Sequence, residues 1–233
     1  MTNPLILALD VEPNEAQSLI KEVSPHIDII KIGSRLFTAL GPKVVEWAHD
    51  KKMKVFLDLK YHDIPNTVAD ACRCAVQLKV WGLTIHTSGG IDMMEEASKA
   101  VLEESNKLRI QKPFLLGVTV LTSLSDLDLK DLGVEKEVLT QVEYLAQSAK
   151  RSHLDGVVAS GNEIEAIRKS CGKDFLVVTP GIRLDGKDQE DQKRVMTPKR
   201  AMDLGANYLV IGRPILKAKD RVKTIKEILE SIQ

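Results

Sequence analysis

Short apolar runs alternate with amphipathic stretches along the whole chain. The runs are rich in Val, Ile and Leu and almost continuously hydrophobic, as is typical of parallel strands that are buried on both faces. They predict eight strands, at residues 5–10, 27–32, 54–59, 82–86, 114–120, 156–159, 175–179 and 208–211.

Between these runs, apolar positions recur at helical spacing. They predict helices at residues 14–23, 42–51, 66–79, 91–107, 137–151, 162–169, 197–204 and 224–231. Start signals support three of them: Asn14 precedes Glu15, Asn162 precedes Glu163, and Thr197 precedes a proline at the first helical position. A strand–helix unit repeated eight times favours an α/β fold, the (β/α)8 TIM barrel. The alternative is an open, doubly wound sheet.

The chain length agrees with a single barrel. It has 233 residues, and a barrel of this type typically has roughly 250. No linker rich in Pro, Gly or Ser divides it, so residues 1–233 are predicted to form a single (β/α)8-barrel domain. The longest polar stretch, residues 183–194, follows the seventh predicted strand. It is either a solvated loop or a mobile lid over the active end of the barrel.

Composition narrows the possible partners and the compartment. The 33 basic side chains balance the 33 acidic ones, so no nucleic acid partner is expected, although a local cluster of cations can still bind a small anion. No apolar stretch approaches the roughly 20 residues of a membrane span, and the apolar start at 5–9 is too short for a signal peptide. The three cysteines form no CxxC pair, which indicates reduced thiols in the cytoplasm.

Charged side chains gather at the predicted carboxyl ends of the first three strands, where barrel enzymes place catalytic groups. They are Asp10, Lys31, Asp58 and Lys60, with Asp63 shortly after. Strand alternation turns Asp58 and Lys60 to the same side. One interpretation is a structural ion-pair network. The other is functional: carboxylates destabilise an anionic substrate while a lysine donates a proton, which indicates proton transfer or carbon–carbon cleavage.

A second cluster indicates phosphate binding. The loops after strands 7 and 8 hold phosphate in many barrels. Here Gly212 lets the backbone approach an anion closely and Arg213 supplies a bidentate cation. Pro180 and Arg183 form a weaker signal because Pro-Gly is common in turns. The alternative is a simple turn with a surface arginine.

The remaining motifs are less specific. His86, at a strand end, is either a base or a hydrogen-bonded structural residue, and His62 is expected to position rather than to react. The sequence contains no GxGxxG, Walker or HExxH motif, so no metal and no nucleotide cofactor is predicted.

The run FLDLKYHDIPNTV at residues 56–68 resembles the signature of orotidine 5'-monophosphate (OMP) decarboxylases, with its Asp-x-Lys-x-x-Asp core. The resemblance is to the short bacterial form and extends over nearly the whole chain. Further matches occur in order: LALD at 7–10, KIG at 31–33, HTSGG at 86–90, GVTVLTS at 117–123, VASGNE at 158–163, TPGIR at 179–183, DQKRVMTP at 191–198 and YLVIGRPI at 208–215.

This resemblance implies a lyase that converts OMP to UMP in de novo pyrimidine biosynthesis, without metal or cofactor, as a cytoplasmic homodimer. It assigns Lys60 as the proton donor to the ring carbon that loses CO₂ and Asp58 as the group that crowds the departing carboxylate. Lys31 and Asp10 would hold the ribose hydroxyls and complete the charge array.

The resemblance also implies contacts outside the array. Residues that would reach across a dimer interface into the partner's site are Asp63, Ile64, Pro65 and Thr67. Residues that would meet the pyrimidine edge are Thr122 and Ser123. Residues that would hold the phosphate are Arg183, Gln192, Gly212 and Arg213, with Gln192 on the lid. Pro180 is a further expected substrate contact.

Two rival functions remain at this stage. One is a Mg²⁺-dependent decarboxylase or aldolase acting on a sugar phosphate, which can carry the same Asp-x-Lys-x-x-Asp core. The other is a non-catalytic barrel that binds a nucleotide. An array of carboxylates facing an anion argues against the second, because binding alone does not require it.

Overall fold

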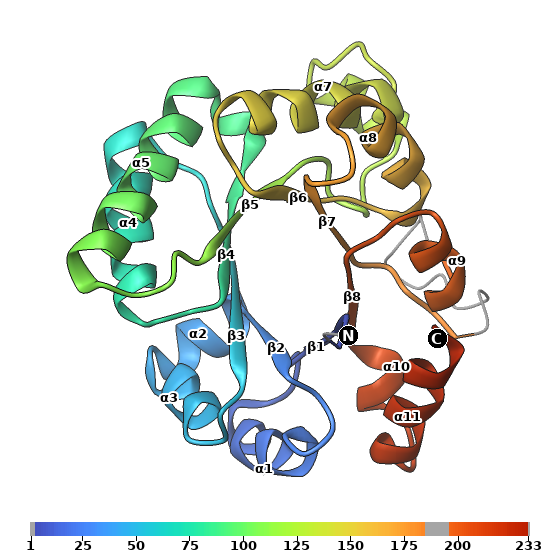
Figure 1. Ribbon diagram of the computed structural model, residues 1–233. Helices are drawn as coiled ribbons and strands as arrows, with labels where there is room; N and C mark the ends of the chain where they lie inside the picture. The colour runs from blue at the N-terminus through green and yellow to red at the C-terminus, as the bar shows by residue number, and fades with distance from the viewer. Residues whose placement is uncertain (1–2, 185–195, 233) are drawn as a thin grey trace.

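The computed structural model describes residues 3–184 and 196–232, and its eight parallel strands close into a barrel (Figure 1). Each strand pairs with the next, and β8 pairs with β1. The predicted (β/α)8 barrel is therefore confirmed, and the open sheet is wrong. The strands are β1 (Leu5–Ala8), β2 (Ile29–Gly33), β3 (Lys54–Tyr61), β4 (Gly82–His86), β5 (Phe114–Val118), β6 (Gly156–Val158), β7 (Leu176–Thr179) and β8 (Tyr208–Ile211).

Helices surround the barrel (Figure 1). They are α1 (Pro13–Val23), α2 (Ser34–Leu40), α3 (Lys43–His49), α4 (Pro65–Gln77), α5 (Ile91–Leu108), α6 (Asp126–Asp131), α7 (Val138–Arg151), α8 (Ile164–Cys171), α9 (Pro198–Asp203), α10 (Arg213–Leu216) and α11 (Arg221–Ser231), with 3₁₀ turns η1 (Thr87–Gly89) and η2 (Gly161–Glu163). Within the described part of the chain, no helix is long and apolar enough to cross a membrane.

The sequence missed the short helices α2, α6 and α10. Each has seven residues or fewer, too few for a helical period to stand out. Two predicted helix starts were also wrong. Helix α1 begins at Pro13, whose ring fixes φ, rather than after Asn14. The predicted start at Asn162 is wrong because the cap lies two residues earlier: the hydroxyl of Ser160 accepts the N–H of Asn162 and caps the turn η2. The cap at Thr197 is confirmed, because its hydroxyl accepts the N–H of Arg200.

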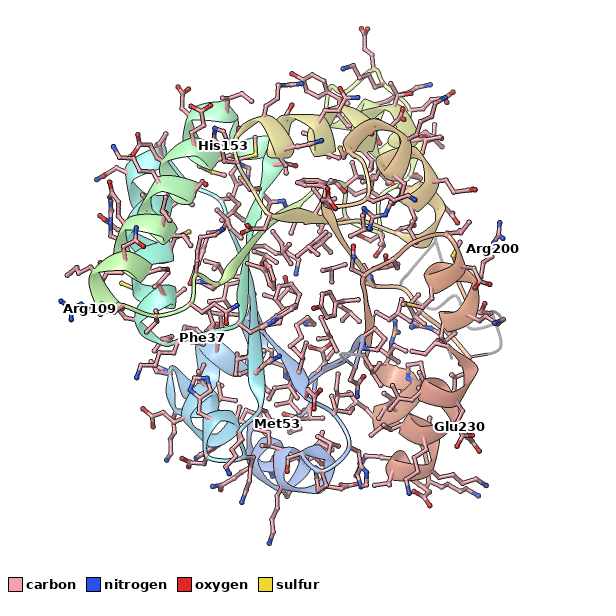
Figure 2. All side chains as sticks on the ribbon, viewed as in Figure 1. Phe37, Met53, Arg109, His153, Arg200 and Glu230 are labelled. Atoms are coloured by element: carbon pink, nitrogen blue, oxygen red, sulfur yellow. The ribbon has the colours of Figure 1, made fainter. Side chains whose placement is uncertain are left out.

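Apolar side chains fill the amino-terminal part of the barrel. The ring of Trp81, just before β4, lies edge-on to Phe56, Phe114 and Tyr208, with centroids 4.9 to 6.0 Å apart. Figure 2 shows side chains occupying the space that the ribbons enclose. Aromatic rings therefore occupy the barrel interior near the amino-terminal ends of the strands, whereas charged side chains lie at the carboxyl ends.

Strand β3 departs from a regular pleat at its functional end. It pairs in register with β4 as far as Leu57 opposite Leu83, and the next pair is Tyr61 opposite Ile85. Between these two pairs, β3 advances by four residues and β4 by only two, so β3 contains a bulge. Within the bulge, Lys60 has a left-handed backbone with φ of 53°. Lys60 and Asp58 still meet on one side, as predicted, with 2.7 Å between Lys60 Nζ and Asp58 Oδ2, but regular strand alternation does not account for it.

Candidate active site

A cavity of about 420 Å³ opens at the carboxyl-terminal end of the barrel. Its charged lining comes from strands β1 to β3 and from the segments that follow β7 and β8. The charged residues are Asp10, Lys31, Asp58, Lys60, Arg183 and Arg213. A larger cavity, of about 610 Å³, lies where β3, β4 and β5 begin. That opposite face of a barrel serves stability rather than chemistry, so the smaller cavity is the candidate active site.

Four of these charges form an alternating row, which we call the charge array: Asp10, Lys31, Asp58 and Lys60. Lys60 Nζ donates to Asp58 Oδ2 over 2.7 Å. Lys31 Nζ lies 3.4 Å from the same oxygen and 3.4 Å from Asp10 Oδ1. The expected meeting of acids and amines from the first three strands is present, because consecutive parallel strands end side by side.

Burial is graded along the charge array. The side chain of Asp58 is 10% exposed and that of Lys31 12%, whereas Lys60 is 33% and Asp10 58% exposed. A Cβ on Gly33 would lie 3.1 Å from Lys31 Nζ, so a glycine at this position leaves room for the ammonium group. Asp58 is thus the buried centre of the array, and Lys60 and Asp10 are its more open ends.

Burial alone would raise the pKa of Asp58. The ammonium groups of Lys31 and Lys60, and hydrogen bonds from Lys60 and Thr84, oppose that effect and hold the pKa below its ordinary value. Asp58 is therefore a carboxylate at neutral pH, with its negative charge inside the cavity.

Thr84 is a site residue that the sequence analysis missed. Its hydroxyl donates to Asp58 Oδ1 over 3.0 Å and accepts the backbone N–H of Lys60 over 2.9 Å. The available signal was a polar residue inside the apolar strand GLTIH. A buried hydroxyl in such a strand needs hydrogen-bond partners, and the neighbouring strand end offered them.

The two histidines lie beside the array. The rings of His62 and His86 are 5.4 Å apart and tilted by 39°. Burial lowers the pKa of His86, and His62 and Lys60 lower it further, while Asp58 opposes them. His86 is therefore neutral at neutral pH.

The residues predicted to contact the phosphate and the pyrimidine mostly lie at the cavity. Its lining includes Thr122, Pro180, Arg183, Gly212 and Arg213, but not Ser123. A Cβ on Gly212 would lie 3.2 Å from Ala8 Cβ, so the backbone after β8 packs closely against β1. Gln192 lies outside the described residues.

The segment predicted to reach a partner subunit lies away from the cavity of this chain. Asp63, Ile64, Pro65 and Thr67 are absent from its lining. The carboxylate of Asp63 accepts the N–H of Ile64 over 2.6 Å, just before α4. Ile64 is 67% exposed. Within one chain, Asp63 therefore does not join the charge array.

Neither the array nor any other part of the described chain gathers three His, Cys, Asp or Glu side chains suited to hold a metal ion. The groups that converge at the cavity are instead paired acids and amines, with two arginines on the segments that follow β7 and β8. A (β/α)8 barrel with acid–base groups at the carboxyl ends of its strands is the architecture of an enzyme that binds a small anionic substrate.

Comparison with known proteins identifies the particular family. The profile of the Orotidine 5'-phosphate decarboxylase / HUMPS family matches residues 3–228, and the chain belongs to this family. Orotidine 5'-phosphate decarboxylases of Haemophilus ducreyi and Actinobacillus pleuropneumoniae are 52% and 51% identical to it, each over the full length of both chains. The crystal structure of orotidine 5'-phosphate decarboxylase from Lactobacillus acidophilus shares 34% identity, with a TM-score of 0.86 over 99% of both chains.

We predict that Asp58 titrates below its ordinary pKa of 3.8. Because the pKa is lowered in the folded protein, its contribution to stability is complete above the unfolded value and is lost as pH falls through the folded value. Carboxyl ¹³C NMR of Asp58 measures this directly. Lys31→Met removes one ammonium group and should move the midpoint upward. A midpoint at or above 3.8 in the parent protein would contradict the account.

Proposed function

We propose that this protein is a carboxy-lyase that converts OMP to UMP and CO₂ in de novo pyrimidine biosynthesis. Its full-length relatives at about half identity carry the name of that activity. The observation that carries the proposal is the charge array, in which Lys60 Nζ lies 2.7 Å from a buried carboxylate. Such an array supplies the two things that a decarboxylation without an electron sink needs: repulsion of a carboxylate and a nearby acid.

The charges of the cavity suit the charges of OMP. Its phosphate would lie against Arg183 and Arg213, which follow β7 and β8, and its ribose against Lys31 and Asp10. The orotate carboxylate would then lie toward Asp58, and the carbon that bears it, C6, toward Lys60. Thr122 and Pro180 also line the cavity and would meet the base. Gln192 and Ser123 stay predicted contacts.

The proposed step moves one electron pair and one proton. The bond between C6 and its carboxylate breaks, CO₂ leaves, and the electron pair stays on C6. The ammonium group of Lys60 stabilises this carbanion-like state and transfers a proton to C6, forming UMP. The neutral Lys60 amine then regains a proton from solvent. The negative charge of Asp58 repels the bound substrate carboxylate. This repulsion is relieved as CO₂ departs.

The phosphate contributes although it does not react. Interactions with a remote group can stabilise the substrate in a position that forces its carboxylate against Asp58.

The Mg²⁺-dependent alternative needs carboxylates available to a metal, whereas Asp58 Oδ2 already contacts both Lys31 and Lys60. The geometry therefore favours decarboxylation by charge repulsion and proton transfer.

We also propose a homodimer in which Asp63, Ile64, Pro65 and Thr67 approach the partner's cavity. The support is the family resemblance together with the exposure of Ile64, an apolar side chain that is 67% exposed beside the start of α4. Because Asp63 does not join the array of its own chain, a role for it in catalysis requires the partner.

The proposal also includes a single domain over residues 1–233 and a cytoplasmic location. The three unpaired cysteines support that location, because free thiols suit a reducing compartment.

The activity is tested by following OMP turnover by absorbance in the presence of EDTA. We expect full activity, because the proposed step uses only side chains. Lys60→Ala should lower kcat by at least about 1,000-fold by removing both the proton donor and the electrostatic stabilisation, with an unchanged circular dichroism spectrum. No turnover by the parent protein, or near-normal kcat in the variant, would refute the proposal.

The dimer is tested by light scattering after size exclusion. The parent protein should have twice the 25.8 kDa of one chain, and Ile64→Asp should shift it toward the monomer and lower activity at low protein concentration. Leu127→Asp is the matched control, because Leu127 is 72% exposed on α6, outside the proposed interface. A parent protein that is monomeric and fully active would disprove the shared site.

A further inference from the structure

Thr84 lies in the middle of β4 and is fully buried. Its neighbours along the strand, Leu83 and Ile85, are buried and apolar. A hydroxyl in such a place is unfavourable unless both its proton and a lone pair are used. Thr84 does not line the cavity, so any effect it has on the reaction must act through other residues.

The hydroxyl joins the two residues at the centre of the proposed chemistry. Asp58 is ionised and can only accept, so the single proton of the Thr84 hydroxyl goes to Asp58 Oδ1, over 3.0 Å. The hydroxyl oxygen accepts the backbone N–H of Lys60, over 2.9 Å. The other oxygen of Asp58 accepts from Lys60 Nζ, over 2.7 Å. These three bonds close a ring through Thr84, Asp58 and both ends of Lys60.

The backbone of Lys60 needs such support. Its φ of 53° is left-handed, a conformation that is costly for a residue with a side chain. The register of β3 on β4 shifts between Leu57 and Tyr61, so the regular ladder is interrupted where Lys60 lies. The Thr84 hydroxyl takes the place of a strand carbonyl as acceptor for the Lys60 N–H. The bulge and the left-handed turn then carry the ammonium group back toward Asp58.

We propose that Thr84 is a positioning residue, whose one hydroxyl holds the Lys60 backbone in its left-handed conformation and orients the Asp58 carboxylate. It thereby sets the distance between the acid and the ammonium group before substrate binds. The effect on turnover rests on the proposed function, whereas the effect on the geometry of Lys60 does not.

Thr84→Val tests this role, because it keeps the branched shape and removes only the hydroxyl. The Lys60 N–H and Asp58 Oδ1 each lose a partner, so we expect kcat for OMP to fall by about 10- to 100-fold, as loss of a hydrogen bond to a buried charged group implies. The Kd for UMP, measured by calorimetry, should change less than about threefold, because UMP lacks the carboxylate that meets Asp58. Thr84→Ser keeps the hydroxyl and should restore most of kcat.

Thr179→Val is the matched control. Thr179 is a fully buried threonine on β7 whose hydroxyl has no hydrogen-bond partner among the described residues. The substitution should leave kcat unchanged. If Thr84→Val lowers only the melting temperature and keeps kcat per folded molecule, Thr84 is merely structural and the proposal fails. It also fails if Thr84→Ser is as impaired as Thr84→Val.

A crystal structure of Thr84→Val separates this proposal from the proposed function. We expect Lys60 to leave its left-handed conformation or its Nζ to move out of hydrogen-bond distance of Asp58 Oδ2. An unchanged Lys60 would overturn the positioning role even in an active enzyme. Absence of OMP turnover by the parent protein would instead overturn the proposed function, and the geometry of the variant would still decide whether Thr84 positions Lys60.

Discussion

The carboxylate of Asp58, buried between two ammonium groups, is the constraint on which the active end of this barrel depends. Removing a charge from water is costly, and a buried ion pair usually stabilises a fold little more than apolar packing would. Here Lys31, Lys60 and Thr84 all contribute to keeping one carboxylate ionised. The proposed mechanism gives this arrangement a chemical reason that stability does not, because it holds negative charge where the substrate carboxylate would lie in that mechanism.

The fold separates the parts that provide stability from the parts that provide chemistry. Aromatic rings around Trp81 pack the amino-terminal end of the barrel interior. At the other end, consecutive strands β1, β2 and β3 bring Asp10, Lys31 and Asp58 into one row. The arginines that follow β7 and β8 complete the lining of the cavity. The closed barrel thus holds the charge array and the two arginines on one rigid frame, although the array and the arginines are far apart in the sequence.

Hydrophobic periodicity predicted the eight strands and the closed barrel, because each strand is buried on both faces and leaves a continuous apolar run. The strand ends then indicated the charge array. The sequence did not reveal the bulge in β3 or the left-handed Lys60, since both arise from pairing with β4. Thr84 was missed for the same reason: its partners lie on a neighbouring strand. The proposed dimer contact of Asp63 would depend on a second chain, which a single chain cannot supply.

The most direct test of the central claim is the kcat of Asp58→Asn, which keeps the size of the side chain and removes its charge. If negative charge at this position drives CO₂ out, kcat should fall by at least about 100-fold while OMP binds as tightly as before or more tightly, because repulsion of the bound substrate is relieved. A variant with kcat within a few-fold of the parent protein would show that the Asp58 charge does not drive the reaction.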